Sequence, residues 1–166
     1  MLHEKLTVSD VKKIQEEIDH RKLVIRKEAL ESVKEARAHG DLSENFEYKA
    51  AKQYKNRNES RIRYLEKMLR NAEIIENVYE DDQVGLDSLV EVYIPEDEEF
   101  ETYKIVTSVR GNSLKGCISI ESPLGQALLG KRVGDVVNVK VNESYSYQIE
   151  VKNVKKSTEE EKIRGF

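Results

Sequence analysis

Residues 39–48 read HGDLSENFEY, a short acidic turn that contains one glycine and lies between two long, highly charged segments. Glycine is favoured directly after the end of a helix, because it adopts a left-handed conformation without a steric penalty. No other glycine and no proline occurs between residues 1 and 84. We therefore predict that two helices meet at this turn, which forms the tip of a helical hairpin.

Apolar residues on both sides of the turn recur mostly three and four positions apart, which is the period of a helix. The first helix follows a capping-box pattern at Thr7 and Asp10, and the second continues to about Asn77. The predicted apolar stripe consists of Val11, Ile14, Ile18, Ile25, Ala29, Val33 and Ala36 before the turn, and of Tyr48, Ala51, Ile62, Leu65, Leu69 and Ala72 after it.

The two stripes also fit each other in register. Facing positions in an antiparallel pair have numbers with a constant sum, and polar residues on such a seam can fix its register. The register that fits the stripes puts Asn58 opposite Ile25, with Arg21 and Lys55 on the seam. Three apolar pairs have numbers that sum to 83: Val11 with Ala72, Ile14 with Leu69, and Ile18 with Leu65. The pattern predicts an antiparallel two-helix coiled coil.

The second half of the chain has a different period. Apolar residues alternate from Val90 onward, as in half-buried strands. Ser122 and Pro123 are the residue types preferred at the N-cap and first turn of a helix, and Gly130 ends that short helix. The predicted fold class is α+β: a coiled-coil hairpin with an acidic tip over 1–78, a linker over 79–88, a small antiparallel β domain with one short helix over 89–156, and a charged, frayed tail over 157–166.

Composition narrows the class of protein. Residues 1–78 carry 17 Lys and Arg against 15 Asp and Glu, whereas residues 79–166 carry 11 against 17. Cys117 is the only cysteine, so an intrachain disulfide is excluded, and a buried thiol is expected. The sequence contains neither a signal-peptide pattern nor the roughly 20 consecutive apolar residues of a membrane span. We expect a cytoplasmic protein that does not enter a membrane.

The pair Asp41 and Glu44 in the turn has two compatible interpretations. An aspartate at the N-cap with a glutamate three residues later is a common helix start, in which both carboxylates gain from the helix dipole. Two carboxylates held at an exposed tip can also bind Mg²⁺, although two are too few for a complete site and would bind weakly alone. The second interpretation requires that a partner supplies the remaining ligands.

A basic stretch follows the acidic turn. Residues 45–70 contain eight Lys and Arg against three Glu. Such a run is often only a solvated helix face, but Arg37 and Lys52 lie within a few turns of the acidic residues. Cations in that position can hold a phosphodiester strand, so the combination suits phosphate chemistry.

Four motifs together resemble the bacterial Gre transcript cleavage factors over most of the chain: EAR (35–37), GDLSENFEYKAAK (40–52), LRNAEII (69–75) and SPLGQALLGKRVGD (122–135). The resemblance implies that the coiled coil enters the secondary channel of RNA polymerase and that an FKBP-like domain docks at the channel rim. It also implies a factor that is not itself an enzyme. The polymerase then cleaves the 3′ end of the nascent RNA in backtracked complexes. Because the coil can bury its apolar stripe within one chain, we expect a monomer.

The resemblance also assigns roles to particular residues. Asp41 and Glu44 become the catalytic pair, which shares a Mg²⁺ ion with the polymerase and orients the attacking water; no cofactor of the factor's own is implied. Phe46 departs from the family pattern, in which a small residue is expected. The remaining assignments are Arg37 and Lys52 near the RNA, Ser43 and Asn45 as auxiliary tip residues, and Ser122, Pro123 and Leu124 at the polymerase rim.

Two other functions remain open from the sequence. A factor with the same fold could occupy the channel as a regulator or inhibitor without stimulating cleavage, although the intact Asp41 and Glu44 pair favours cleavage. A coiled-coil chaperone with a peptide-binding β domain would have an apolar tip. Asp41, Glu44 and Glu47 argue against that interpretation.

Overall fold

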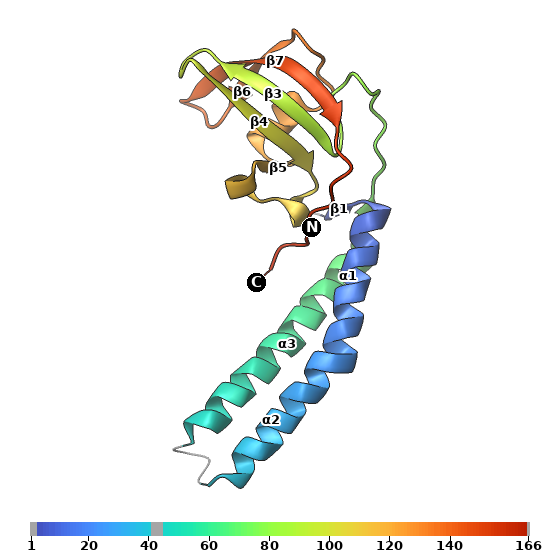
Figure 1. Cartoon of the computed structure of the whole chain (residues 1–166), viewed down its shortest axis with the longest axis vertical. Helices are drawn as coiled ribbons and strands as arrows, with labels where there is room; N and C mark the ends of the chain where they lie inside the picture. The colour runs from blue at the N-terminus through green and yellow to red at the C-terminus, as the bar shows by residue number, and fades with distance from the viewer. Residues whose placement is uncertain (1–2, 41–44, 166) are drawn as a thin grey trace. The chain divides into compact units, whose positions relative to one another are not determined.

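The computed structural model describes residues 3–40 and 45–165, and the chain forms two compact units (Figure 1). The first unit contains Val8–Glu73 and the residues up to Glu4, and the second contains Lys5–Thr7 and Ile74–Gly165. A long helical hairpin makes up the first unit and a curled β-sheet the second. The predicted α+β class, with a helical first half and a strand-rich second half, is confirmed.

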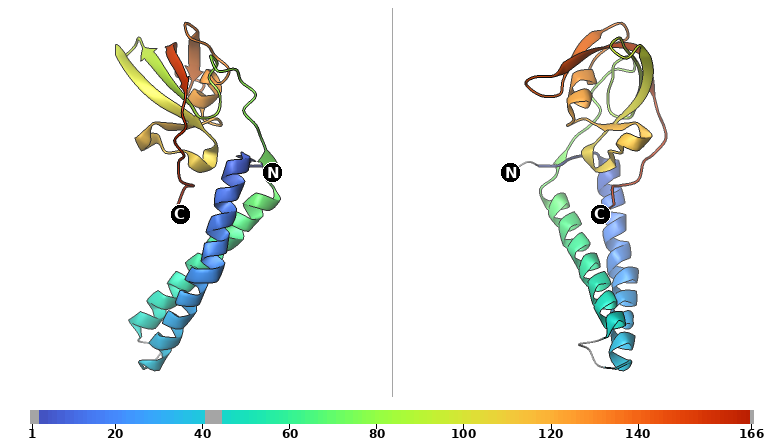
Figure 2. Two further views of the ribbon diagram at one scale, coloured as in Figure 1. Left: turned by 45° about the vertical axis from the view of Figure 1, so that its right-hand side comes forward. Right: turned by 90° about the vertical axis from the view of Figure 1, so that its left-hand side faces the viewer.

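The hairpin consists of a rising arm in three pieces and a descending arm in one. The rising arm is α1 (Val8–His20), a π-helical turn η1 (Arg21–Ile25) and α2 (Arg26–Ala38), and the descending arm is α3 (Phe46–Arg70). Figure 2 shows the two arms side by side in both views. The second helix ends at Arg70 instead of near Asn77, because the chain then enters the short strand β2 (Glu73–Ile74).

Apolar side chains from the two arms fill the seam of the hairpin, as the stripe predicted. Six residues that we placed on the stripe are only half-buried: Val11, Ile25, Tyr48, Ala51, Leu69 and Ala72. Met68, beside Leu69, is 8% exposed. The buried apolar residues of the helices are Ile14, Ile18, Ala29, Val33, Ala36, Ile62, Leu65 and Met68.

A polar contact lies where the rising arm changes from α to π geometry. In η1 the Arg26 N–H donates to the Arg21 carbonyl, five residues back. Asn58, which is 2% exposed, donates from Nδ2 to the same carbonyl at 3.2 Å and accepts from the Arg21 guanidinium at 3.1 Å. Asn58 thus lies on the seam, as predicted, but its hydrogen bonds reach Arg21 and not Ile25. The carbonyl that begins the π turn is therefore also an acceptor for Asn58.

Two short strands meet at the base of the hairpin. β1 (Lys5–Leu6) precedes α1 and β2 follows α3, and the two form a small sheet. The Glu73 N–H donates to the Glu4 carbonyl at 2.8 Å, and the Ile75 N–H donates to the Leu6 carbonyl at 2.9 Å. The chain therefore enters and leaves the hairpin through neighbouring strands.

The second unit is a five-stranded sheet with the order β5-β4-β3-β7-β6. Neighbouring strands are antiparallel except β4 and β5, which are parallel. The strands are β3 (Ser88–Ile94), β4 (Glu99–Val106), β5 (Cys117–Ser119), β6 (Val136–Lys140) and β7 (Ser146–Lys156). The short helix α4 (Pro123–Leu128) contributes the fully buried Leu128 to the core that the sheet encloses.

Segments outside the strands complete this unit. Residues 79–88, which we expected to be a linker, contribute Val84 and Leu86 to the core, because these apolar side chains pack under the sheet. The tail, which we expected to be frayed, is held by Glu161 against Lys104 and Arg110. Cys117 is a buried thiol, as predicted, and burial raises its pKa. Within the described residues, no helix combines the length and the apolar character that crossing a bilayer requires.

Candidate functional site

The descending helix α3 begins directly after the acidic turn, and Asn45 is its N-cap. Asn45 Oδ1 accepts a hydrogen bond from the Tyr48 N–H at 3.1 Å. We expected Asp41 to supply this cap. Asn45 takes the position instead, since asparagine is among the best N-cap residues and lies four residues closer to the first helical turn. Asp41, Ser43 and Glu44 lie outside the described residues.

Asn45 also joins the two arms of the hairpin. Its Nδ2 donates to the Ala36 carbonyl at 2.6 Å, so one side chain binds the last turn of α2 and the first turn of α3. On the exposed surface, His39 Nδ1 lies 3.0 Å from Glu47 Oε2 and forms a second link between the arms. Residues 41–44 are therefore bounded on both sides by positions that are bonded to each other.

One of the two cations predicted near the tip lies over an aromatic ring. The Arg37 guanidinium carbon lies 5.5 Å from the centre of the Tyr48 ring. A hydrogen bond from Arg37 lowers the pKa of the Tyr48 hydroxyl, and the charge of Lys52 adds to this effect. Arg37 thus lies over Tyr48, and Lys52 lies one turn further along the same helix as Tyr48. Tyr48 was not among the predicted site residues. The sequence feature that could have indicated it is an aromatic residue shortly after the glycine of the turn, with Arg37 shortly before that glycine.

Other cations of the hairpin hold its two arms together. Arg61 is 5% exposed, and its Nε donates to Glu17 Oε2 at 2.9 Å. Arg26 makes two hydrogen bonds to the Glu59 carboxylate, at 2.7 and 3.0 Å. Burial opposes ionisation of Glu17, but the hydrogen bonds and charges of Arg61 and Arg21 outweigh it and lower the pKa. Arg61 is therefore a buried structural residue, so the basic stretch is not one uniform surface.

The predicted docking loop lies in the second unit, where it starts α4. Ser122 Oγ accepts from the Gly125 N–H at 3.0 Å and donates to the Ser119 carbonyl at 2.7 Å, so the predicted N-cap is confirmed. Pro123 occupies the first turn, as expected. Together with Leu124, these residues line a groove of about 740 Å³ beside β5.

Two family models match the chain. The model "Transcription elongation factor, N-terminal" matches residues 4–74, and the model "Transcription elongation factor, GreA/GreB, C-term" matches residues 79–156. These matches define the class of protein, that of the transcription elongation factors. They divide at nearly the same point as the two compact units.

Two relatives found by sequence agree with this class. Transcription elongation factor GreA of Thermoanaerobacter pseudethanolicus is 48% identical over 139 residues, which cover 82% of this chain and 87% of that protein. GreA of Geobacillus kaustophilus is 47% identical over 136 residues, which cover 81% and 85%. The crystal structure of the GreA factor homolog 1 (Gfh1) protein of Thermus thermophilus is 30% identical, covers 92% of this chain and 99% of that one, and has a TM-score of 0.43. The chain belongs to the GreA/GreB family.

Proposed function

We propose that this factor binds RNA polymerase, inserts the hairpin tip into its secondary channel and stimulates the polymerase's own cleavage of the RNA 3′ end in backtracked complexes. Membership of the GreA/GreB family supports this function. The observation that carries it furthest is Asn45, whose side chain joins α2 to α3 across residues 41–44. Asn45 therefore bonds the helix ends on either side of residues 41–44 to each other, and positioning of reacting groups is one way to lower a reaction barrier.

Asp41 and Glu44 carry the proposed chemistry. Their carboxylate oxygens are hard ligands that suit Mg²⁺, and the polymerase would supply the ligands that two carboxylates lack. Residues 3–40 and 45–165 contain no group of three or more His, Cys, Asp or Glu side chains that could hold a metal, so this assignment rests on the two tip carboxylates. The shared ion would stabilise negative charge on the phosphate as the bond breaks. Asp41 and Glu44 would orient the attacking water beside it.

The other tip residues have supporting roles. Arg37, which lies over Tyr48, and Lys52, one turn further along α3, would contact phosphates of the extruded RNA. Ser43 is proposed as an auxiliary contact. Asn45 acts mainly through the helix cap, because both ends of its amide already have partners.

The second unit is proposed to dock the factor on the polymerase through Ser122, Pro123 and Leu124. The hydrogen bonds of Ser122 hold this loop at the start of α4, where it borders the groove. We further propose that the curled sheet with its single helix is FKBP-like. We also propose that the factor acts as a monomer, because the hairpin buries its apolar stripe within one chain.

The proposed function is tested by RNA cleavage in halted, backtracked elongation complexes with Mg²⁺. We expect wild type to shorten the RNA, whereas Asp41→Asn and Glu44→Gln bind the polymerase but lose at least about tenfold in cleavage rate, equivalent to about 1.4 kcal/mol of barrier. Glu47→Gln is the matched control, since Glu47 is an exposed acid of the same turn that pairs with His39. Its cleavage rate should stay within about twofold of wild type.

Three results would contradict the proposal in different ways. Wild type that binds the polymerase and leaves the RNA intact would make the factor a channel-occupying regulator. If wild type does not bind the polymerase, both cleavage stimulation and channel-occupying regulation are excluded. Equal losses in all three variants would indicate that general tip charge, and not the Asp41 and Glu44 pair, is responsible.

A further inference from the structure

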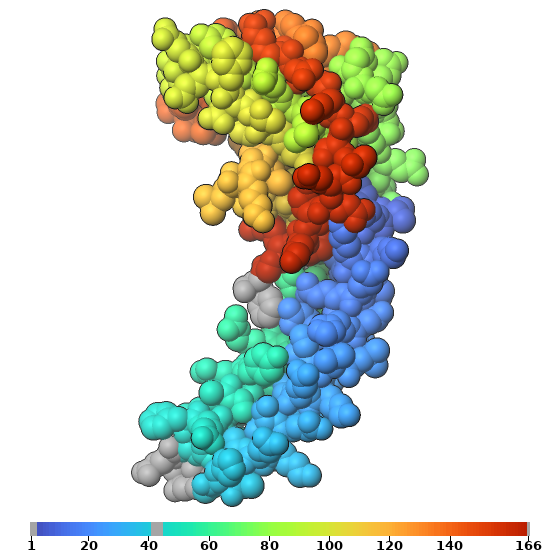
Figure 3. Space-filling view, in the orientation of Figure 1, coloured from blue at the N-terminus to red at the C-terminus, as the bar shows by residue number. Residues whose placement is uncertain are grey.

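The C-terminal segment 157–165 lies beyond the part of the chain that matches the family models, which ends at residue 156. It is nevertheless bonded to the second unit at both ends. The Ser157 N–H donates to the Asp87 carbonyl at 3.0 Å, and the Arg164 N–H donates to the Val109 carbonyl at 2.7 Å. Figure 3 shows this segment, in dark red, lying on the surface of the molecule.

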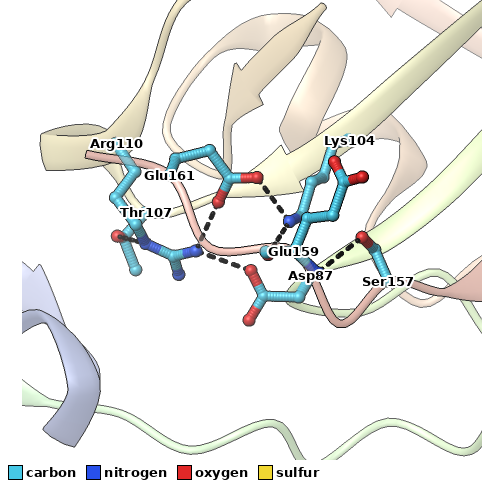
Figure 4. A network of polar contacts seen from close by, with 7 residues as sticks. All are labelled: Asp87, Lys104, Thr107, Arg110, Ser157, Glu159 and Glu161. Carbon is cyan, nitrogen blue, oxygen red and sulfur yellow. Dashed lines mark hydrogen bonds and ion pairs between the residues drawn. The ribbon is translucent and has the colours of Figure 1, made fainter. Parts of the chain in front are cut away.

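Glu161 attaches the middle of the segment to the second unit through ion pairs (Figure 4). Its carboxylate pairs with the ammonium group of Lys104 and lies 3.1 Å from the Arg110 guanidinium. The side chains of Lys104 and Arg110 are both only 6% exposed. Arg110 also contacts Asp87 at 2.6 Å, and Lys104 also donates to the Glu159 carbonyl. The segment thus meets two buried cations through one acid.

Charge pairing explains why the segment stays in place. A buried cation is unfavourable unless an anion and hydrogen-bond acceptors accompany it. For Lys104, the acceptors among the described residues, Glu159 and Glu161, both belong to the C-terminal segment. Burial opposes ionisation of Glu161, but the hydrogen bond and charge of Lys104 outweigh it and lower the pKa, with a further contribution from Arg110. Glu161 therefore remains charged at neutral pH and keeps the segment attached.

The end of this segment borders the groove beside the docking loop. Arg164 and Gly165 line the same groove of about 740 Å³ as Ser122, Pro123 and Leu124. The Arg164 backbone is fixed there by its hydrogen bond to Val109. A partner that uses the groove thus meets residues of the chain's own C-terminus.

We propose that residues 157–165 form a strap that occupies one side of this groove and competes with the docking partner, and that Glu161 is its latch. The proposal rests on the proposed function, since the partner is the polymerase surface that docks at Ser122–Leu124. In the strapped state the groove is partly closed. Release of the latch opens it and raises the affinity for polymerase.

The test compares Glu161→Ala with Glu159→Ala in the full-length protein. Both changes remove one acid from the segment, but only Glu161 meets Lys104 and Arg110 through its carboxylate, whereas Glu159 uses its backbone carbonyl. The apparent affinity is proportional to the fraction of molecules in the binding-competent state. If the groove is open in about a tenth to a third of molecules, Glu161→Ala should bind polymerase roughly three- to tenfold more tightly, and Glu159→Ala should match wild type.

Hydrogen exchange measures opening of the strap in the absence of the polymerase. The Arg164 amide should exchange at least about tenfold faster in Glu161→Ala than in wild type, because its bond to Val109 opens with the strap. Amides of β3 should keep their protection, which shows that the sheet remains folded. In a second variant that ends at Lys156, polymerase binding should be tight, and a peptide of residues 157–166 added in trans should weaken it.

Each outcome decides between the two proposals. If wild type and Glu161→Ala bind polymerase equally tightly, the strap proposal is overturned and the proposed function is unaffected. If wild type binds poorly and Glu161→Ala binds well, the strap is supported. If neither binds, both the function and the strap as its regulator are overturned. Unchanged exchange at Arg164 in Glu161→Ala also overturns the latch.

Discussion

Gly125 illustrates how a single residue holds the docking loop. A Cβ atom at this position would lie 1.9 Å from the Ser119 carbonyl oxygen and 2.8 Å from the Ser119 carbonyl carbon. That carbonyl also accepts the hydrogen bond from Ser122 Oγ. Glycine is needed here for the close approach of two backbone segments, and not for an unusual φ angle.

We therefore expect Gly125→Ala to destabilise the second unit by about 1–3 kcal/mol, the usual range for overpacking a buried position. The backbone at Ser119 must move, because carbonyl atoms cannot change rotamer. Gln126→Ala is the control, since this exposed neighbour lies on the same helix and should change stability by less than about 0.5 kcal/mol. Urea unfolding measures both, and equal stabilities would show that the loop accepts the methyl group.

The sequence predicted some residue-scale features and missed others. The cap at Ser122 and the proline after it were predictable, because both follow from local preferences. The cap of α3 was assigned to Asp41, since Asp41 and Glu44 fit a capping box. The structure gives the cap to Asn45, which also bonds to Ala36, a contact that sequence spacing alone does not reveal.

At the scale of the elements, the hairpin combines an apolar seam with a buried polar layer. Arg61 and Arg21 both donate to Glu17, and Arg21 also meets Asn58 beside the π turn. Such residues add specificity of register more readily than net stability. The layer makes the stability of the hairpin depend on the charge of Glu17.

The sign of that dependence follows from the lowered pKa of Glu17. A carboxylate with a lowered pKa in the folded state contributes stability above its unfolded pKa and loses it as the pH falls through the folded value. The hairpin should therefore lose stability below about pH 4.5, the ordinary pKa. Glu17→Gln should lower the free energy of unfolding by about 1–3 kcal/mol at neutral pH, because Arg61 loses its charged partner. The same substitution should reduce the acid limb, which is the fall in stability as the pH drops below about 4.5.

Helical circular dichroism during urea unfolding, repeated from pH 7 to pH 3, measures this effect. Glu16→Gln provides the control, since Glu16 is the exposed neighbour on the same helix. An acid limb of the same slope in wild type and Glu17→Gln would exclude Glu17 as its source.

The helices were predictable because their stripes are long and regular, but the π turn was not. One signal was present: Leu23, Val24 and Ile25 are three consecutive apolar residues, which no regular α-helix brings to one face. Leu23 is 76% exposed in the structure. Arg21, which begins the π turn, bonds to Asn58 across the hairpin, and a distant partner of this kind leaves no local pattern.

At the scale of the whole molecule, each unit has its own buried apolar set. Leu65 is fully buried in the hairpin, and Val92 is fully buried within the core of the sheet. The change of period near residue 88 predicted this division. The strand order β5-β4-β3-β7-β6 was not predictable, because pairing between β3 and β7 joins residues far apart in the sequence.

Separate cores should give separate responses to core mutations. Leu65→Ala should destabilise the hairpin by about 2–5 kcal/mol and speed hydrogen exchange in α1, α2 and α3, while the strands keep their protection. Val92→Ala should give the opposite pattern. Exchange that rises in both units for either variant would show that the two unfold as one cooperative structure.

The small sheet of β1 and β2 has a consequence for protein engineering. The chain enters the hairpin at Leu6 and leaves it at Ile75 through adjacent strands, so the two ends of this segment lie side by side. For protein design, the hairpin can be treated as a segment inserted between the adjacent strands β1 and β2. Seven residues added to each arm would lengthen its reach by roughly 10 Å, at 1.5 Å per residue, without any change at the insertion point.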